Sequence, residues 1–185
     1  GGGAGTLIEL ADTDIAVRSI AVALTNPDAE TSDTSGWTTT GTWEAETAEG
    51  DITAPHGGTW YFSATGATNP AILEQVVDLA AQGFTAAELD GGATFGASVW
   101  AASEYQSDTG ELKLQFLDGA GGDVGSAFTT GEFGPNDGSW VERTLGGSVP
   151  AGARQARIQL LAHNNSGSNT THGFDDLSLS LSVPR

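Results

Sequence analysis

The sequence predicts an all-β fold, an antiparallel β-sandwich of the jelly-roll type with an extended N-terminal arm. Three observations support this prediction. Many short segments are apolar or alternate between apolar and polar residues, glycine-rich turns separate them, and no long amphipathic helix interrupts them. The chain has 185 residues, enough for one well-buried domain and short for two. We divide it into residues 1–25, a leader and strand arm, and residues 26–185, the sandwich.

Residues 1–25 differ in composition from the rest of the chain. The first five, Gly-Gly-Gly-Ala-Gly, form a flexible leader. Residues 7–10 and 15–24 are apolar enough to be strands, and the second segment has apolar residues at alternate positions. Two alternatives stay open at this point. These segments are the first strands of the domain, or they are an arm that pairs with an edge strand of a neighbouring subunit.

The strands expected within the sandwich are short, and most of them alternate in polarity. They cover residues 43–46, 58–63, 72–79, 94–101, 111–117, 139–145, 154–161 and 177–183. Residues 72–79 would also suit a short helix. The clearest alternation is in residues 111–117, where Leu112, Leu114 and Phe116 face inward, as in a half-buried antiparallel strand. Turn signals fall between the strands at residues 55–58, 90–92, 118–122, 135–138 and 150–152.

The charge of the chain excludes several classes of partner. Six Lys and Arg residues oppose 24 Asp and Glu residues, which gives a formal net charge of −18. Such a chain repels nucleic acids and anionic membrane surfaces. It contains no run of about 20 apolar residues, so we expect no membrane insertion. It has no cysteine, which excludes disulfides and thiol catalysis. The depletion of lysine fits a salty or Ca²⁺-rich setting outside the cell.

Two acidic segments lie far apart in the sequence. Residues 26–37 contain Asp28, Glu30 and Asp33 among turn-forming residues, and residues 173–181 begin with Asp175 and Asp176 before a strictly alternating strand. If these strand ends meet in one sheet, they offer the oxygen ligands that Ca²⁺ prefers. The spacing does not match an EF-hand loop. The candidate metal ligands are Asp28, Glu30, Asp175 and Asp176.

The order of the motifs resembles that of galactose-binding-domain-like carbohydrate-binding modules. The matching segments are residues 26–37, 54–62, 112–118, 149–158 and 173–179. Modules of this family occur on glycan-active enzymes, bacterial surface proteins and phage tail or virion proteins. The resemblance implies a jelly roll with a structural Ca²⁺ where the opening motif meets the last strand, held by Glu30 and by Asp175 or Asp176. We prefer Asp175, because it shares the parity of the inward Leu177. Pro27 and Ser32 stand where the family usually has glycine.

Sugar binding requires an aromatic face beside groups that hydrogen-bond hydroxyls. The candidates that combine these features are Trp43, His56, Trp100, Glu104, Tyr105, Trp140, Asn164, Asn165 and His172. Trp100 and Tyr105 are the candidate stacking platforms, whereas Trp37 and Trp60 are expected in the core. The polar loop of residues 163–172 has two interpretations, a recognition loop or a solvated connection between strands.

We expect no catalysis, because no nucleophile elbow, zinc-protease motif or phosphate-binding loop is present. The sequence therefore predicts a non-catalytic, Ca²⁺-stabilised carbohydrate-binding or adhesion module that is extracellular, on a cell surface or on a virion. The alternative is a structural subunit of a virion or an extracellular filament. In that case residues 1–25 would contact identical or neighbouring subunits.

Overall fold

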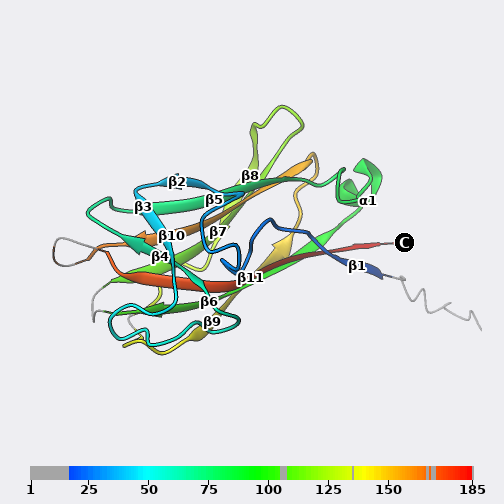
Figure 1. Ribbon diagram of the computed structural model, residues 1–185. Coiled ribbons are helices and arrows are strands. Elements are labelled where there is room, and N and C mark those ends of the chain that lie inside the picture. Colours follow the sequence, from blue (N-terminus) through cyan, green and yellow to red (C-terminus); the bar gives the residue numbers. More distant parts are fainter. Residues whose placement is uncertain (1–16, 105–107, 135, 166, 168–169, 185) are drawn as a thin grey trace, which may run out of the picture.

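The computed structural model describes residues 17–104, 108–134, 136–165, 167 and 170–184 (Figure 1). The expected leader, the expected strand of residues 7–10 and the candidate Tyr105 lie outside these residues. The elements are β1 (Val17–Ala21), β2 (Thr38–Thr40), β3 (Thr42–Glu46), β4 (Tyr61–Thr65), β5 (Ala71–Asp78), α1 (Ala86–Asp90), β6 (Thr94–Ser103), β7 (Thr109–Leu117), β8 (Asp123–Thr129), β9 (Val141–Ser148), β10 (Gln155–His163) and β11 (His172–Pro184).

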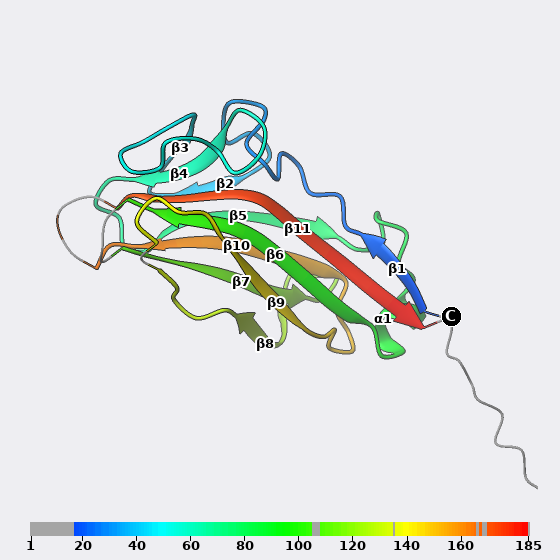
Figure 2. The same cartoon turned by 90° about the horizontal axis from the view of Figure 1, so that it is seen from below.

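Two antiparallel sheets form a sandwich, as the sequence predicts. The first has the order β3-β4-β11-β6-β9, and β1 also pairs with β11. We call it the β11 sheet. The second, which we call the β10 sheet, has the order β2-β5-β10-β7-β8. Figure 2 shows the two layers stacked, with most strands along the long axis of the molecule.

The core lies between the sheets and follows the predicted alternation. In β7, Leu112, Leu114 and Phe116 are fully buried, and the inward residues of β10 and β11 are buried with them. Burying a side chain of this size stabilises the fold by about 1.5–3 kcal/mol. Trp37 and Trp60 are partly buried against this core. Trp37 packs edge-on to Phe62, with ring centroids 5.6 Å apart. Residues 71–78 form a strand, so the helical alternative for this segment is wrong.

Segment β1 belongs to the sheet of its own chain. Residues Val17–Ala21 pair with Ser180–Pro184 of β11 in an antiparallel register. Arg18 extends from β1 to α1, where its guanidinium lies 2.7 Å from Glu88. Figures 1 and 2 show β1 beside the C-terminal end of β11, at one end of the molecule. The chain therefore enters and leaves the described part of the sandwich at the same end.

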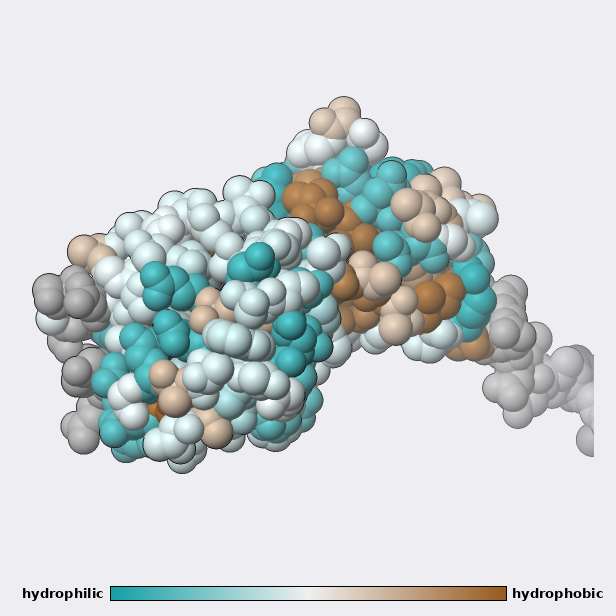
Figure 3. All heavy atoms as spheres, viewed as in Figure 1, coloured by the Kyte–Doolittle hydropathy of each residue, from teal (hydrophilic) through white to brown (hydrophobic). Residues whose placement is uncertain are grey.

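Hydrophobic residues are unevenly distributed on one face of the molecule. On the face shown in Figure 3, the hydrophobic colour gathers toward the end that contains β1. Among the described residues, the exposed large hydrophobic side chains are Val17 and Val76. No helix in the described ranges is long and apolar enough to cross a membrane.

A β-bulge in β11 changes the direction of one predicted side chain. The pairing with β6 shifts by one residue between Asp175 and Ser178, and Asp176 has a φ of 48°. Phe174 and Leu177 both face the core, so Asp175 points to the outer face of the sheet. The prediction that Asp175 shares the inward parity of Leu177 is therefore wrong. Its side chain is nevertheless buried, because a loop covers this part of the outer face.

Candidate functional site

The loop between β3 and β4, residues 47–60, lies over the outer face of the β11 sheet. Ile52 from this loop is fully buried with Tyr61 of β4 and Ala102 of β6, and Trp140 packs against them. This small apolar cluster is separate from the main core. It fixes the loop to the sheet and holds the side chains described below.

Four aromatic rings meet under and beside this loop. His56 stacks on Trp100, with ring centroids 3.8 Å apart and planes inclined by 12°. Trp140 stands edge-on to His56 at 6.3 Å and to Tyr61 at 5.4 Å. The indole nitrogen of Trp140 donates a hydrogen bond to the carbonyl of Ala54 at 2.9 Å, which orients its ring. We call these four residues, His56, Tyr61, Trp100 and Trp140, the aromatic cluster. His56, Trp100 and Trp140 remain partly exposed.

Two aspartates of the bulge hold the loop beside the aromatic cluster. Asp175 is the cross-strand partner of Trp100, and its carboxylate accepts a hydrogen bond from the backbone N–H of Gly57 at 3.0 Å. Burial raises the pKa of Asp175 to about 6. Asp176 lies on the other side of the loop, with Oδ2 2.6 Å from Nδ1 of His56. The bulge therefore places two successive carboxylates against one turn.

The opening motif and the last strand meet, as the resemblance implies. The N–H of Leu177 donates to the carbonyl of Pro27 at 3.0 Å. Glu30 reaches the same loop, and its Oε1 accepts hydrogen bonds from the N–H groups of Thr59 and Trp60 at 2.7 and 2.8 Å. Asp28 accepts a bond from the N–H of Glu30 at 3.4 Å.

These contacts are the turn caps that acidic side chains often provide. Within the described ranges, no three acidic or histidine side chains gather closely enough to hold a metal ion. Glu30 and the bulge aspartates could supply carboxylate ligands to Ca²⁺ only together with backbone carbonyls, a mixture that Ca²⁺ accepts. Gly57 and Gly58 permit the approach, because a Cβ at Gly58 would overlap the carboxylate of Glu30 and one at Gly57 would lie 2.7 Å from Oδ2 of Asp176.

Four glutamates lie on the outer face near Tyr61 and Ser63. Glu44 and Glu46 are the cross-strand partners of Ser63 and Tyr61. Glu49 accepts a hydrogen bond from the Ser63 hydroxyl at 2.5 Å. The carboxylate of Glu104 lies over Gly50, where a Cβ would overlap it. We call Glu44, Glu46, Glu49 and Glu104 the glutamate cluster. Burial, followed by the charges of Glu104, Glu46 and Glu44, raises the pKa of Glu49.

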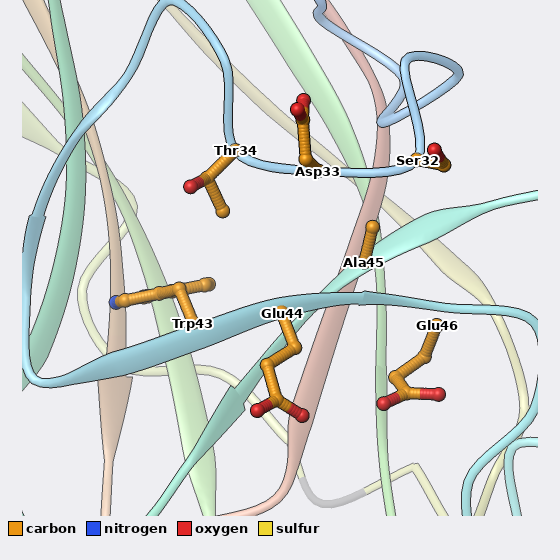
Figure 4. A pocket seen from close by; sticks show the side chains of 7 residues that line it. All are labelled: Ser32, Asp33, Thr34, Trp43, Glu44, Ala45 and Glu46. Atoms are coloured by element: carbon orange, nitrogen blue, oxygen red, sulfur yellow. The ribbon is translucent and has the colours of Figure 1, made fainter.

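A hollow of about 320 Å³ adjoins the glutamate cluster along β3. Its lining consists of Ser32, Asp33, Thr34, Trp43, Glu44, Ala45 and Glu46. Figure 4 shows Asp33 and Thr34 on the loop on one side of β3, and the carboxylates of Glu44 and Glu46 directed to the other side. The volume of the hollow lies at the lower end of the range of ligand pockets.

The remaining sequence candidates lie apart from the aromatic cluster. Trp43 is buried and packs on Phe174. His172 is fully buried in the core, where burial lowers its pKa to about 3. Asn164 bonds to Asn69, and the Asn165 amide donates to Thr109 and Glu132.

These asparagines hold the loop at one end of the sheets. Tyr61, Glu44, Glu46 and Glu49 were not among the site residues predicted from the sequence. A strand around Tyr61 was predicted, but the burial of Phe62 in the main core, which turns Tyr61 to the outer face, depends on pairing with distant strands.

Neither a family model nor a curated protein matches this sequence. Several solved structures share its fold. A domain of bacteriophage CBA120 tailspike protein 4 aligns with 84% of this chain at a TM-score of 0.62 and 17% identity, and this chain covers 20% of that protein chain. A family 16 carbohydrate-binding module aligns with 84% of this chain at 0.59 and 17% identity, covering 97% of the module.

A CBM22 xylan-binding domain from Xyn10C of Paenibacillus barcinonensis aligns with 83% of this chain at a TM-score of 0.51 and 16% identity, covering 90% of that domain. At these identities the likeness establishes the fold, a β-sandwich of the kind found in carbohydrate-binding modules. The predicted fold class is confirmed.

Proposed function

We propose that this domain is a non-catalytic carbohydrate-binding module that binds a glycan at the aromatic cluster. The observation that carries the proposal is the convergence of His56, Trp100 and Trp140 on the outer face of the β11 sheet. The fold supports it, because whole modules described as carbohydrate-binding align along nearly their full length with this chain.

The chemistry of the cluster suits a sugar ring. The C–H face of a pyranose packs on partly exposed aromatic rings, and neighbouring polar groups bond its hydroxyls. Asp176 lies beside His56, and Glu142 is the exposed cross-strand partner of Trp100. Ser98 and Ser178 continue this polar surface along the sheet, where their hydroxyls lie 2.9 Å apart.

Binding to a panel of soluble polysaccharides, including xylan, tests the proposal. Affinity electrophoresis should show retardation of the domain by at least one glycan. Trp100→Ala should weaken that binding about thirtyfold, the effect of about 2 kcal/mol for a central aromatic residue. Val76→Ala is the matched control, because Val76 is an exposed apolar residue on the other sheet. Equal retardation of wild type and Trp100→Ala, with the fold intact by circular dichroism, contradicts the proposed site.

We also propose that Ca²⁺ stabilises the junction of Glu30 with Asp175 and Asp176. The donor chemistry supports this, since carboxylates from both ends of the chain contact one four-residue stretch, Gly57–Trp60, and Ca²⁺ takes carboxylate oxygens as ligands. A ligand that binds only the folded state adds about 2.7 kcal/mol at a hundredfold excess over its dissociation constant. Thermal unfolding with Ca²⁺ and then with chelator should differ by about 5–10 °C.

Glu30→Gln and Asp175→Asn should abolish this difference, while Glu74→Gln on the other sheet should keep it. An unchanged unfolding midpoint in the wild type would leave these acids as turn caps only.

The second candidate function is a structural subunit of a virion or an extracellular filament. The observation that favours it is the fold shared with a phage tailspike domain. In this alternative, the N-terminal segment, predicted as residues 1–25, contacts neighbouring subunits and the sandwich acts as a spacer. Because Val17–Ala21 pair with β11 of the same chain, the test concerns residues 1–16. Light scattering on the chain with and without residues 1–16 separates the two functions. Loss of multimers on deletion supports assembly, and a monomer in both forms contradicts it.

A further inference from the structure

The glutamate cluster carries four negative charges on one small area of the β11 sheet. Two of them stand on the outer face of β3, directly opposite Ser63 and Tyr61. The other two come from loops, Glu49 through its bond to Ser63 and Glu104 through its position over Gly50. The strand register and these contacts place the four carboxylates on the part of the outer face that contains Ser63 and Tyr61.

No basic side chain in the described ranges neutralises this cluster. The ion pairs of the described residues involve other acids, and none includes Glu44, Glu46, Glu49 or Glu104. Among the described residues, the Ser63 hydroxyl is the only side-chain group that donates a hydrogen bond to the cluster. Like charges that lie close together repel, and a cation supplied from outside removes that repulsion.

A second, independent observation points to an external group. The hydroxyl of Tyr61 is completely buried and has no hydrogen-bond partner among the described residues. Glu46 is the cross-strand partner of Tyr61, and after burial the charges of Glu49, Glu46 and Glu104 raise the pKa of its hydroxyl. Buried polar groups without a partner are uncommon, and an unsatisfied one often marks the place of an absent ion, water or ligand.

The spacing of the carboxylates favours an ammonium group over a bare metal ion. In the described ranges no three acidic side chains converge tightly enough for metal coordination. An ammonium group needs no such convergence, since each of its three N–H donors bonds a separate acceptor. It is also attracted to the faces of aromatic rings, and Trp140 packs against Tyr61 at the border of the cluster.

We propose that the glycan bound at the aromatic cluster carries protonated amino groups, and that the glutamate cluster binds them. The ligand class is therefore an amino sugar polymer or oligomer, such as one containing glucosamine units. The aromatic cluster binds the ring faces, and the glutamates select the ammonium substituent. This inference rests on the proposed carbohydrate-binding function and specifies its ligand.

Calorimetric titration with glucosamine oligomers and with N-acetylglucosamine oligomers of the same length tests the proposal. The two probes differ in the charge at one nitrogen. Below the pKa of the amine, the wild type should bind the glucosamine oligomer about tenfold more tightly, and added salt should reduce this preference. Glu46→Gln and Glu104→Gln should each lower the preference severalfold.

Glu74→Gln is the matched control, because it removes the same charge from the outer face of the other sheet. It should retain the preference. Equal affinity of the wild type for both oligomers overturns the inference and leaves the proposed function intact, provided that Trp100→Ala abolishes the binding. An equal loss of preference in Glu74→Gln and Glu46→Gln also overturns it, since the net charge of −18 would then be the cause. If neither oligomer nor any neutral glycan binds, the proposed function fails as well.

Discussion

The acidic side chains on the outer faces of the two sheets differ in whether they have side-chain partners within the domain. On the β10 sheet, Glu74, Asp123 and Glu111 have polar or basic side-chain partners on the same sheet. Glu74 accepts a bond from Gln159 at 2.8 Å, Asp123 lies 3.6 Å from Arg157, and Glu111 lies 3.1 Å from His163. These three acids therefore have side-chain partners within the domain.

The outer face of the β11 sheet is different at the end covered by residues 47–60. Its glutamate cluster has no basic partner in the described part of the chain, and it borders on the aromatic cluster. The comparison teaches that a net charge of −18 does not by itself mark a binding surface. The informative feature is a place where the protein lacks internal partners for its acids while it holds aromatic rings beside them.

The largest effect expected from this difference is on glycan binding. His56→Ala removes the ring that stacks on Trp100 and should weaken binding about tenfold, or about 1.4 kcal/mol. Lys113→Ala and Arg157→Ala change the outer face of the β10 sheet and should leave the affinity unchanged. Titration of the three variants with one glycan measures this contrast. The reverse result, loss in Lys113→Ala and none in His56→Ala, would move the binding surface to the other sheet.

A smaller effect, on the stability of the domain, is expected when the hydroxyl of Tyr61 is removed. Tyr61→Phe removes a buried polar group without a partner and should raise the free energy of unfolding by about 1 kcal/mol. The midpoint of thermal unfolding should rise by about 2–4 °C in a domain of this size. Combining it with Glu46→Gln in a double-mutant cycle measures the coupling between the hydroxyl and the cluster. A lower midpoint for Tyr61→Phe would show that the hydroxyl has a favourable partner in solution.

The smallest expected effect is on the pH dependence of stability. The contributions of Glu49 and Glu132 change in opposite directions as the pH falls. The pKa of Glu49 is raised, chiefly by burial, so the folded state binds this proton more tightly than the unfolded state. Its contribution to stability therefore grows as the pH falls toward 4.5, the ordinary value. The pKa of Glu132 is lowered, chiefly by a hydrogen bond from Thr109, so its contribution is lost as the pH falls through the lowered pKa.

Urea unfolding of Glu49→Gln and Glu132→Gln at neutral and acidic pH measures both contributions. At neutral pH, Glu49→Gln should stabilise the domain by less than about 1 kcal/mol. That advantage over the wild type should shrink on acidification. Glu132→Gln should be slightly destabilising at neutral pH, and this deficit should also shrink. A deficit for Glu49→Gln at neutral pH would mean that the glutamate cluster is compensated in solution.

Most of the fold could be predicted because its strands alternate. The inward residues of β7, β10 and β11 are the ones that periodicity predicts. Strand β8 was missed because it contains Gly125 with a φ of 68° and lacks regular alternation. Helix α1 is only five residues long, too short for a helical period. Its capping box of Thr85 and Glu88 was the signal available.

The candidate site could be predicted less completely. Sequence reasoning selected His56, Trp100 and Trp140 as separate residues, but their contact depends on the path of residues 47–60 over the sheet. It placed Asp175 on the wrong side, because one extra residue in a bulge reverses every side chain that follows. A bulge of this kind depends on pairing between distant strands, which local periodicity does not report.

The long strand β11 has a mechanical consequence for a domain that holds a ligand under tension. It runs from His172, through the bulge at Asp175 beside Trp100 of the aromatic cluster, to Pro184, beside Val17. Antiparallel hydrogen bonds lie perpendicular to the strands, so a pull from the cluster toward Pro184 shears the β11–β6 ladder and loads its bonds together. A pull that separates Val17 from Pro184 instead opens the β1–β11 pairs one after another from the end. The domain should therefore resist force transmitted from its ligand to Pro184 better than force applied between Val17 and Pro184.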